Sequence, residues 1–156
     1  MIKIMTPIGV DSEQRYALRT RGFDKDGNEY IYLRGCASTI KYSPVIYDEN
    51  GYTVLADSAG TAPANDGPLA IAQAIVDATT EWGWYMIYGK TYVICLTDVT
   101  DNEQVYLTTT AGSVDDADVA SAAVIGMWFR GANTAGAGGT ALVQLSYPVV
   151  HSDAIN

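Results

Sequence analysis

The sequence is poor in the residues that build catalytic and metal sites. It holds one histidine, His151, and two cysteines, Cys36 and Cys95, which stand far apart in the chain. His151 lies near the end of the chain beside Ser152 and Asp153, and neighbours in a tail cannot hold the geometry of a catalytic triad. The Cys and His spacing of a zinc site is missing as well. We therefore expect a protein that is not an enzyme and that uses no cofactor or metal.

Basic residues are also scarce. Nine Lys and Arg oppose 18 Asp and Glu, which gives a net charge of −9 and argues against a nucleic-acid partner, since phosphate binding depends on clustered Lys and Arg. Residues 1–41 hold seven basic and five acidic residues, a net +2, whereas the rest holds two basic and thirteen acidic residues, a net −11. The acidic body either serves solubility alone, or the basic front docks on an acidic partner.

Long hydrophobic runs are absent. No segment approaches the roughly 18 apolar residues of a membrane span, and the start of the chain lacks the apolar stretch of a secretory signal. We expect a protein that is neither exported nor bound to a membrane. With 48% hydrophobic and 17% charged residues, the 156-residue chain is expected to fold as one domain.

Tyrosine, in contrast, is abundant at 11 residues. With Val, Ile and Thr it fills short runs that glycine or Asn/Asp-Gly turns separate, as in strands and hairpins. The predicted fold is mostly β, a small antiparallel β-sandwich or barrel with long loops. The predicted strands are 15–21 and 30–33 around the turn 24–28, 39–47 and 52–55 around the turn 48–51, then 84–88, 91–96, 105–110, 124–129 and 141–145.

Residues 57–68 contain two prolines and two glycines, so we expect an exposed loop that divides one β domain, residues 15–156, into two halves. The segment after it, Leu69 to Ala78, is ambiguous. Its alanines and a capping Asp66 favour a helix. Its large side chains also alternate with alanine, which favours a strand packed closely against another layer. Local propensity alone predicts the helix.

Two patterns match binding sites only in part. The stretch Asp24–Glu29 resembles the start of a calcium loop, but glycine occupies the fourth position, and Gly35 stands where an EF-hand needs its bidentate Glu. A hairpin turn is the better interpretation. Residues 131–139 are glycine-rich, yet they lack lysine and precede a strand, so we expect a mobile surface loop and not a phosphate cradle.

Tryptophan and cysteine raise two further alternatives. Trp82, Trp84 and Trp128 have the chemistry to stack on sugars, as in a carbohydrate-binding module, but Trp84 and Trp128 lie in strand patterns, where core packing is the commoner role. Cys36 and Cys95 also lie in predicted strands. A buried free thiol is the expected state of both.

The second half of the sequence resembles the capsid decoration, or head-associated, proteins of tailed bacteriophages. The resemblance covers residues 69–150 and rests on the order and spacing of its pieces, since no single piece is specific. These pieces are Ala70–Ala74, Trp82–Gly89, Val105–Val114, Val124–Met127 and Ala141–Pro148. The resemblance implies that residues 70–76 form a strand leading into the Gly-Trp turn, and on this ground we predict a strand there instead of a helix.

The resemblance also implies a function. It implies a cement protein of the virion that assembles as a homotrimer or other small oligomer, binds the major capsid protein on the outer capsid surface and stabilises its lattice. Such a protein is made in the bacterial host cytoplasm, and the family has no catalytic residues. The alternative is a receptor- or glycan-binding module of a head fibre or tail. Exposed strand edges that pair with another chain suit attachment to a capsid.

Residues 1–14 are the candidate docking segment. Their apolar residues are interrupted by Pro7 and Gly9 and show no periodicity of an independent element, so they form either a first strand or an arm that becomes ordered on a partner. Pro7 and Gly9 weaken an internal strand and favour the arm. The basic residues that follow would hold the arm near an acidic capsid surface. The predicted capsid-binding residues are Ile4, Met5, Pro7, Ile8, Arg15, Arg19 and Arg21.

Overall fold

The structure, a computed structural model, describes residues 1–3, 9–59 and 64–151, and within them every regular element is a strand. The predicted mostly β class is therefore confirmed. The strands are β1 (Ile2–Lys3), β2 (Val10–Asp11), β3 (Arg21–Phe23), β4 (Glu29–Arg34), β5 (Pro44–Tyr47), β6 (Thr53–Leu55), β7 (Gly67–Ala72), β8 (Trp82–Ile94), β9 (Gln104–Leu107), β10 (Val114–Asp115), β11 (Ala123–Phe129) and β12 (Thr140–Val150).

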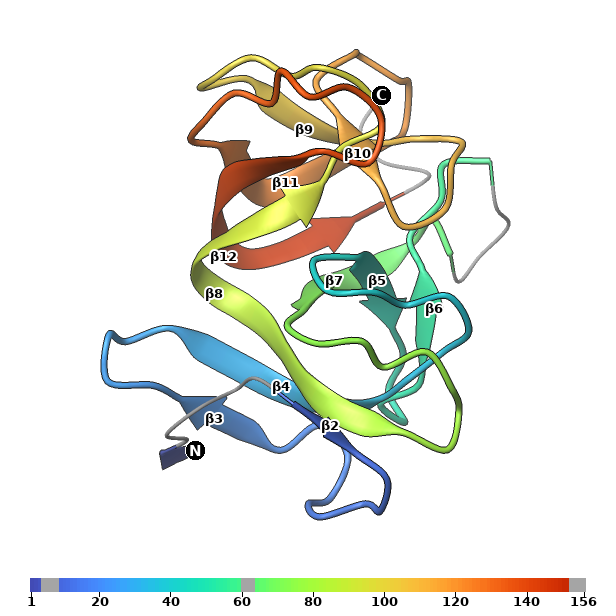
Figure 1. Cartoon of the computed structure of the whole chain (residues 1–156), viewed down its shortest axis with the longest axis vertical. Helices are drawn as coiled ribbons and strands as arrows, with labels where there is room; N and C mark the ends of the chain where they lie inside the picture. Colours follow the sequence, from blue (N-terminus) through green and yellow to red (C-terminus); the bar gives the residue numbers. More distant parts are fainter. Residues whose placement is uncertain (4–8, 60–63, 152–156) are drawn as a thin grey trace.

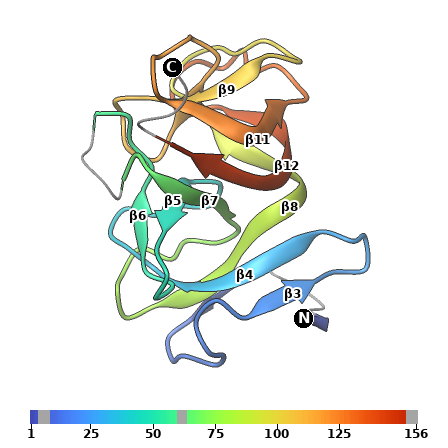
Figure 2. The same cartoon turned by 180° about the vertical axis from the view of Figure 1, so that it is seen from behind.

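Hydrogen bonds join these strands into one open mixed sheet that does not close into a barrel. β1 pairs with β3 in parallel, whereas the other strand pairs are antiparallel. The long strand β8 crosses the molecule from the β3–β4 hairpin to the group of β9, β11 and β12, and both views show it as the shared element (Figures 1 and 2). Its first half pairs with β4 and β7, and its second half pairs with β12.

Gly89 bends β8 between these two halves. Its φ of +114° lies in a region that side chains rarely adopt, and a Cβ there would overlap the Asn28 amide. The pairing with β4 ends at Tyr88, and the pairing with β12 runs from Tyr88 to Ile94. The two predicted strands 84–88 and 91–96 therefore form one continuous strand that changes direction at this glycine.

Both predicted hairpins are present. β3 and β4 pair around residues 24–28, and β5 and β6 pair around residues 48–52. Two predicted strand starts are wrong, because the backbone there is not extended. Arg19 has a φ of +68° and Tyr42 a φ of +73°, so regular pairing begins only at Arg21 and Pro44.

The first part of the ambiguous segment, residues 69–72, forms a strand as part of β7. It pairs with β5 on one side and with β8 and β12 on the other. The strand predicted for 70–76 is present, but it ends at Ala72, and no helix follows it before β8. Tertiary pairing on both edges outweighs the helix propensity of its alanines.

The core lies on both faces of the central strands. Leu69 and Ile71 of β7 belong to one buried cluster, whereas Ala70 and Ala72 belong to a second cluster. The same split divides alternate residues of β4, β5 and the first half of β8. These strands are therefore apolar at nearly every position, which is typical of strands covered on both faces.

The second half of β8 and strands β9, β11 and β12 instead alternate between buried and accessible positions. This alternation corrects one prediction. Trp84 is buried, with 7% of its surface exposed, as predicted, but Trp128 is 37% exposed and lies on the accessible face of β11. Trp128 is thus not a core residue.

The two cysteines also differ. Cys95 is buried after β8, and burial raises the pKa of its thiol to about 12, as expected for an inert structural thiol. Cys36 is only half-buried and lies in a turn after β4, where its Sγ is 3.1 Å from Thr39 Oγ1. The prediction of a buried strand position is therefore wrong for Cys36.

Candidate docking and ligand surface

The predicted capsid-binding residues divide into two sets. Ile4, Met5, Pro7 and Ile8 lie outside the described residues. The segment that contains them is bounded by β1, which pairs with β3, and by β2, which pairs with β8 at Gly83 and Trp82. Each of these strands has two residues, and Ile2, Lys3 and Val10 are exposed.

The three arginines are exposed and each has an intramolecular partner. Arg15 forms a salt bridge of 2.9 Å to Asp11, while Nη1 of Arg19 donates to the Glu49 carbonyl at 3.0 Å. The guanidinium of Arg21 lies 5.6 Å from the ring centre of Tyr147. Burial raises the pKa of the Tyr47 phenol, and the positive charges of Arg21 and Arg19 both oppose that rise. Exposed pairs of this kind contribute little stability and leave the cations accessible to a partner.

Arg21 belongs to an exposed aromatic cluster that the sequence did not indicate. Tyr147 has a φ of +49°, opposite a register shift of β11, and its ring lies 5.3 Å from that of Tyr88. The Tyr147 hydroxyl donates to the Glu29 carboxylate, and this hydrogen bond raises the pKa of Tyr147. A bulky residue in this backbone region is strained, and such strain often marks functional sites.

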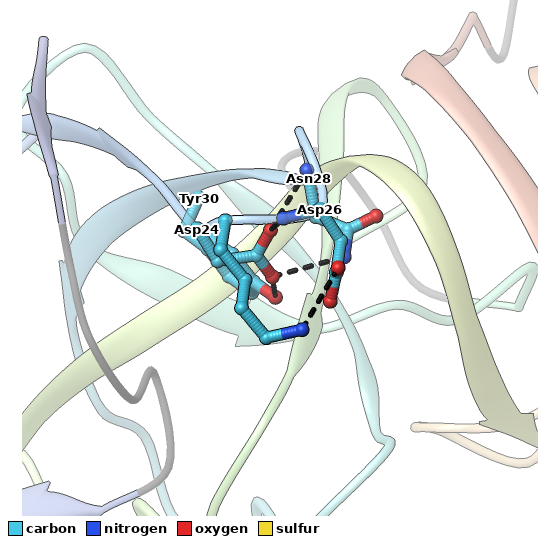
Figure 3. A network of polar contacts seen from close by, with 5 residues as sticks. Asp24, Asp26, Asn28 and Tyr30 are labelled. Carbon is cyan, nitrogen blue, oxygen red and sulfur yellow. Dashed lines mark hydrogen bonds and ion pairs between the residues drawn. The ribbon is translucent and has the colours of Figure 1, made fainter.

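The turn of the β3–β4 hairpin is organised by Asp24 (Figure 3). Its Oδ1 accepts from the backbone N–H groups of Asp26 and Asn28 at 2.9 and 3.1 Å, and its Oδ2 accepts from Asn28 Nδ2 and the Tyr30 hydroxyl at 2.9 and 2.8 Å. Burial alone would raise the pKa of Asp24, but these hydrogen bonds outweigh it and lower the pKa. Burial and the bond to Asp24 raise the pKa of Tyr30. The predicted hairpin turn is confirmed, and Asp24 is its internal hydrogen-bond acceptor.

This turn forms one wall of an open hollow of about 480 Å³. Asn28 lies against β8, where its Oδ1 is 3.4 Å from the Lys90 N–H. Residues from five parts of the chain line the hollow: the turn with β4, residues 41 and 42, Gln73, β8 and β12. The lining residues are Asp24, Asn28, Tyr30, Lys41, Tyr42, Gln73, Met86, Lys90, Thr91, Tyr92 and Leu142.

The glycine-rich segment 131–139 connects β11 and β12, as predicted, and several hydrogen bonds anchor it. Asn133 is buried and donates through Nδ2 to the carbonyls of Thr97 and Gly136 at 2.9 and 3.0 Å. Asp98 accepts from the Gly136 N–H at 2.8 Å, and the Gly138 N–H donates to the Cys95 carbonyl at 2.9 Å. These contacts hold the loop against residues 95–98, which follow β8.

Residues 1–3, 9–59 and 64–151 contain no group of three or more His, Cys, Asp or Glu arranged to hold a metal ion. Nor does that part of the chain contain a helix long and apolar enough to cross a membrane. His151 Nδ1 lies 3.6 Å from Asp66 Oδ1 across an exposed contact, and its sequence neighbours Ser152 and Asp153 fall outside the described residues.

The fold has a counterpart among solved structures. The crystal structure of the head fibre gp8.5 N base of bacteriophage phi29 matches with a TM-score of 0.52 at 14% sequence identity. The match covers 78% of this chain and 97% of that chain. No protein-family model matches the sequence, and a search of curated proteins gives no match. The chain is thus an all-β protein that shares its fold with the base of a phage head fibre.

Proposed function

We propose that this chain is a structural protein of a tailed-phage head that binds the outer capsid surface and stabilises the major capsid protein lattice. The observation that carries the proposal is the likeness in fold to the phi29 head-fibre base, nearly all of which is covered. The ordered sequence pieces between residues 70 and 148, which resemble decoration proteins, agree with it. The protein acts by binding and not by catalysis, it needs no cofactor, and its place is the virion.

Residues 1–14 suit attachment because the sheet holds their ends weakly. β1 and β2 contribute two residue pairs each and bury little surface, so their release costs little free energy. A released segment with free backbone groups can add as a strand to an edge on a neighbouring protein. The apolar Ile4, Met5 and Ile8 then supply contacts in the complex.

Arg15, Arg19 and Arg21 supply the electrostatic part of the proposal. They are exposed and follow the docking segment directly, in a chain whose remaining surface is strongly acidic. Complementary charge speeds association and orients the partners. The proposed oligomer is a homotrimer, in which weak contacts of three copies to the same lattice reinforce one another.

Binding to empty heads that lack the protein tests this proposal. Changing Arg15, Arg19 and Arg21 together to Ser is expected to lower the bound fraction, measured by co-sedimentation, more at low salt than at high salt, because salt screens exposed charges. Lys25→Ser is the matched control, since Lys25 is exposed and its one ion pair among the described residues is with Asp26. If the triple variant binds as well as the control at every salt concentration, the arginines do not contact the capsid.

A second candidate function is a head fibre or tail module that binds a receptor or glycan on the host cell. The fold likeness favours it, because the solved neighbour is itself the base of a head fibre. A cement protein and a fibre differ in how many copies a virion carries. The copy number therefore separates the two candidates.

A further inference from the structure

The hollow between the β3–β4 turn and β8 has the composition of a ligand site. Its volume of about 480 Å³ falls within the roughly 300–1,000 Å³ of small-molecule sites. We propose that it binds one saccharide ring that carries an anionic group, as part of a bacterial surface glycan. The inference deepens the second candidate function, and it is tested on the purified protein without heads, so its failure leaves capsid attachment untouched.

Two tyrosines provide an apolar corner. The rings of Tyr42 and Tyr92 are 5.7 Å apart and inclined by 56°, and Tyr92 is 47% exposed on the accessible face of β8. Met86 and Leu142 complete the apolar lining. A sugar ring can place its apolar C–H face against these side chains, which removes that face from water. Its hydroxyl groups then remain accessible at the edge of the ring.

Polar groups are available beside this corner. Gln73 is buried, and its Nε2 donates to the Ile71 carbonyl at 3.0 Å and to Thr91 Oγ1 at 3.3 Å. Within the described part of the chain its Oε1 accepts no hydrogen bond, and Thr91 Oγ1 donates none. One acceptor and one donor thus remain for the hydroxyl groups of a ligand.

The charge of the hollow favours an anionic sugar over a neutral one. Lys41 and Lys90 both line it, and in the ranges that the structure describes neither forms a salt bridge. The Lys41 ammonium lies 4.9 Å from the ring centre of Tyr42. Asp24 is the one carboxylate in the lining, and its two oxygens already accept four hydrogen bonds from the turn. The hollow is net positive on a chain of net charge −9.

The site is held in shape before any ligand binds. Tyr42 has a φ of +73°, and its backbone is fixed on both sides, by its N–H to the Ala72 carbonyl at 2.8 Å and by its carbonyl to the Ile94 N–H at 3.2 Å. Asp24 fixes the opposite wall through Asn28, which lies against β8. A wall that is already ordered loses little entropy on binding, and strained residues of this kind are common at ligand sites.

The test is binding of the purified protein to an array of bacterial surface glycans that bear carboxylate, phosphate or no charge, followed by titration calorimetry on those bound. Charged glycans are expected to bind in preference to neutral ones. Tyr92→Ala is expected to lower the association constant at least about tenfold, whereas Tyr92→Phe keeps it. Tyr52→Ala is the matched control, because Tyr52 is similarly exposed, at 43%, and lies outside the hollow.

The Lys41→Gln, Lys90→Gln double variant is expected to lose the preference for charged glycans and most of the salt dependence. Thermal unfolding checks that every variant is folded. The proposal is overturned if no charged glycan binds at about millimolar concentration. It is equally overturned if Tyr92→Ala binds like Tyr52→Ala, if neutral and charged glycans bind alike, or if a single-stranded oligonucleotide binds more tightly than any glycan.

Discussion

At the scale of single residues, Asp24 holds together the β3–β4 turn that lines one side of the hollow. Its carboxylate satisfies two backbone donors of the hairpin turn and two side-chain donors, and one of these, Asn28, lies against β8 beside Gly89. The turn could be predicted from Asp24–Asn28, because the interactions that form it are local. The contact with β8 could not, since Asn28 and Lys90 are distant in the sequence.

Asp24→Ala is expected to lower the free energy of unfolding by about 1–3 kcal/mol, because it leaves four donors without their acceptor. Denaturant unfolding near neutral pH measures the change. Asp26→Ala is the matched control in the same turn. Among the described residues the Asp26 side chain pairs only with exposed Lys25, so this variant should change the value by less than about 0.5 kcal/mol. Equal effects of the two variants would show that the network does not stabilise the hairpin.

The loss of stability caused by Asp24→Ala is also expected to depend on pH. The pKa of Asp24 is lower in the folded state than its ordinary value of about 3.8. The stability it contributes is therefore fully present above that value and is lost as the pH falls through the lower, folded pKa. The difference between wild type and Asp24→Ala should stay constant from pH 7 to about pH 5 and shrink below about pH 4.

At the scale of secondary structure, the elements that a local sequence pattern determines could be predicted. Those that depend on tertiary contacts could not. The β3–β4 and β5–β6 hairpins follow from their turn residues. Strand pairing at 15–20 and 39–43 fails because Arg19 and Tyr42 adopt positive φ angles, which nothing in their sequence neighbourhood requires. The exposure of Trp128 depends on which face of β11 is covered, and this also lies beyond a local pattern.

The hollow was missed for the same reason. Its tyrosines, lysines and Gln73 come from separate segments of the chain, at residues 30, 41–42, 73 and 90–92, and no spacing in the sequence groups them. The docking segment, by contrast, was proposed from composition and charge alone, and residues 4–8 lie outside the described structure.

Deletion of residues 1–10 tests that segment as an element. Because β1 and β2 contribute two residue pairs each, the truncated protein is expected to keep its fold and oligomeric state, as measured by circular dichroism and light scattering. Its binding to empty heads is expected to fall sharply. Full decoration of heads by the truncated protein would place the capsid contacts in the body of the molecule instead.

At the scale of the whole molecule, the parts of the sheet differ in how far their faces are covered. Strands covered on both faces form the centre, while the second half of β8 with β9, β11 and β12 presents one accessible face. The docking segment pairs with β3 and β8, and the hollow opens beside the β3–β4 turn. In the functions proposed above, the sheet stays in place and residues 1–14 are the part that moves on binding.

The copy number of the chain in purified virions tests the proposed capsid-stabilising function most directly. A protein that cements the lattice is expected in an amount comparable with the major capsid protein, because each repeating unit of the shell offers an equivalent site. Gel densitometry or quantitative mass spectrometry of intact virions gives this ratio. Comparable amounts support the capsid-stabilising function, whereas tens of copies or fewer, or absence from the virion, would contradict it.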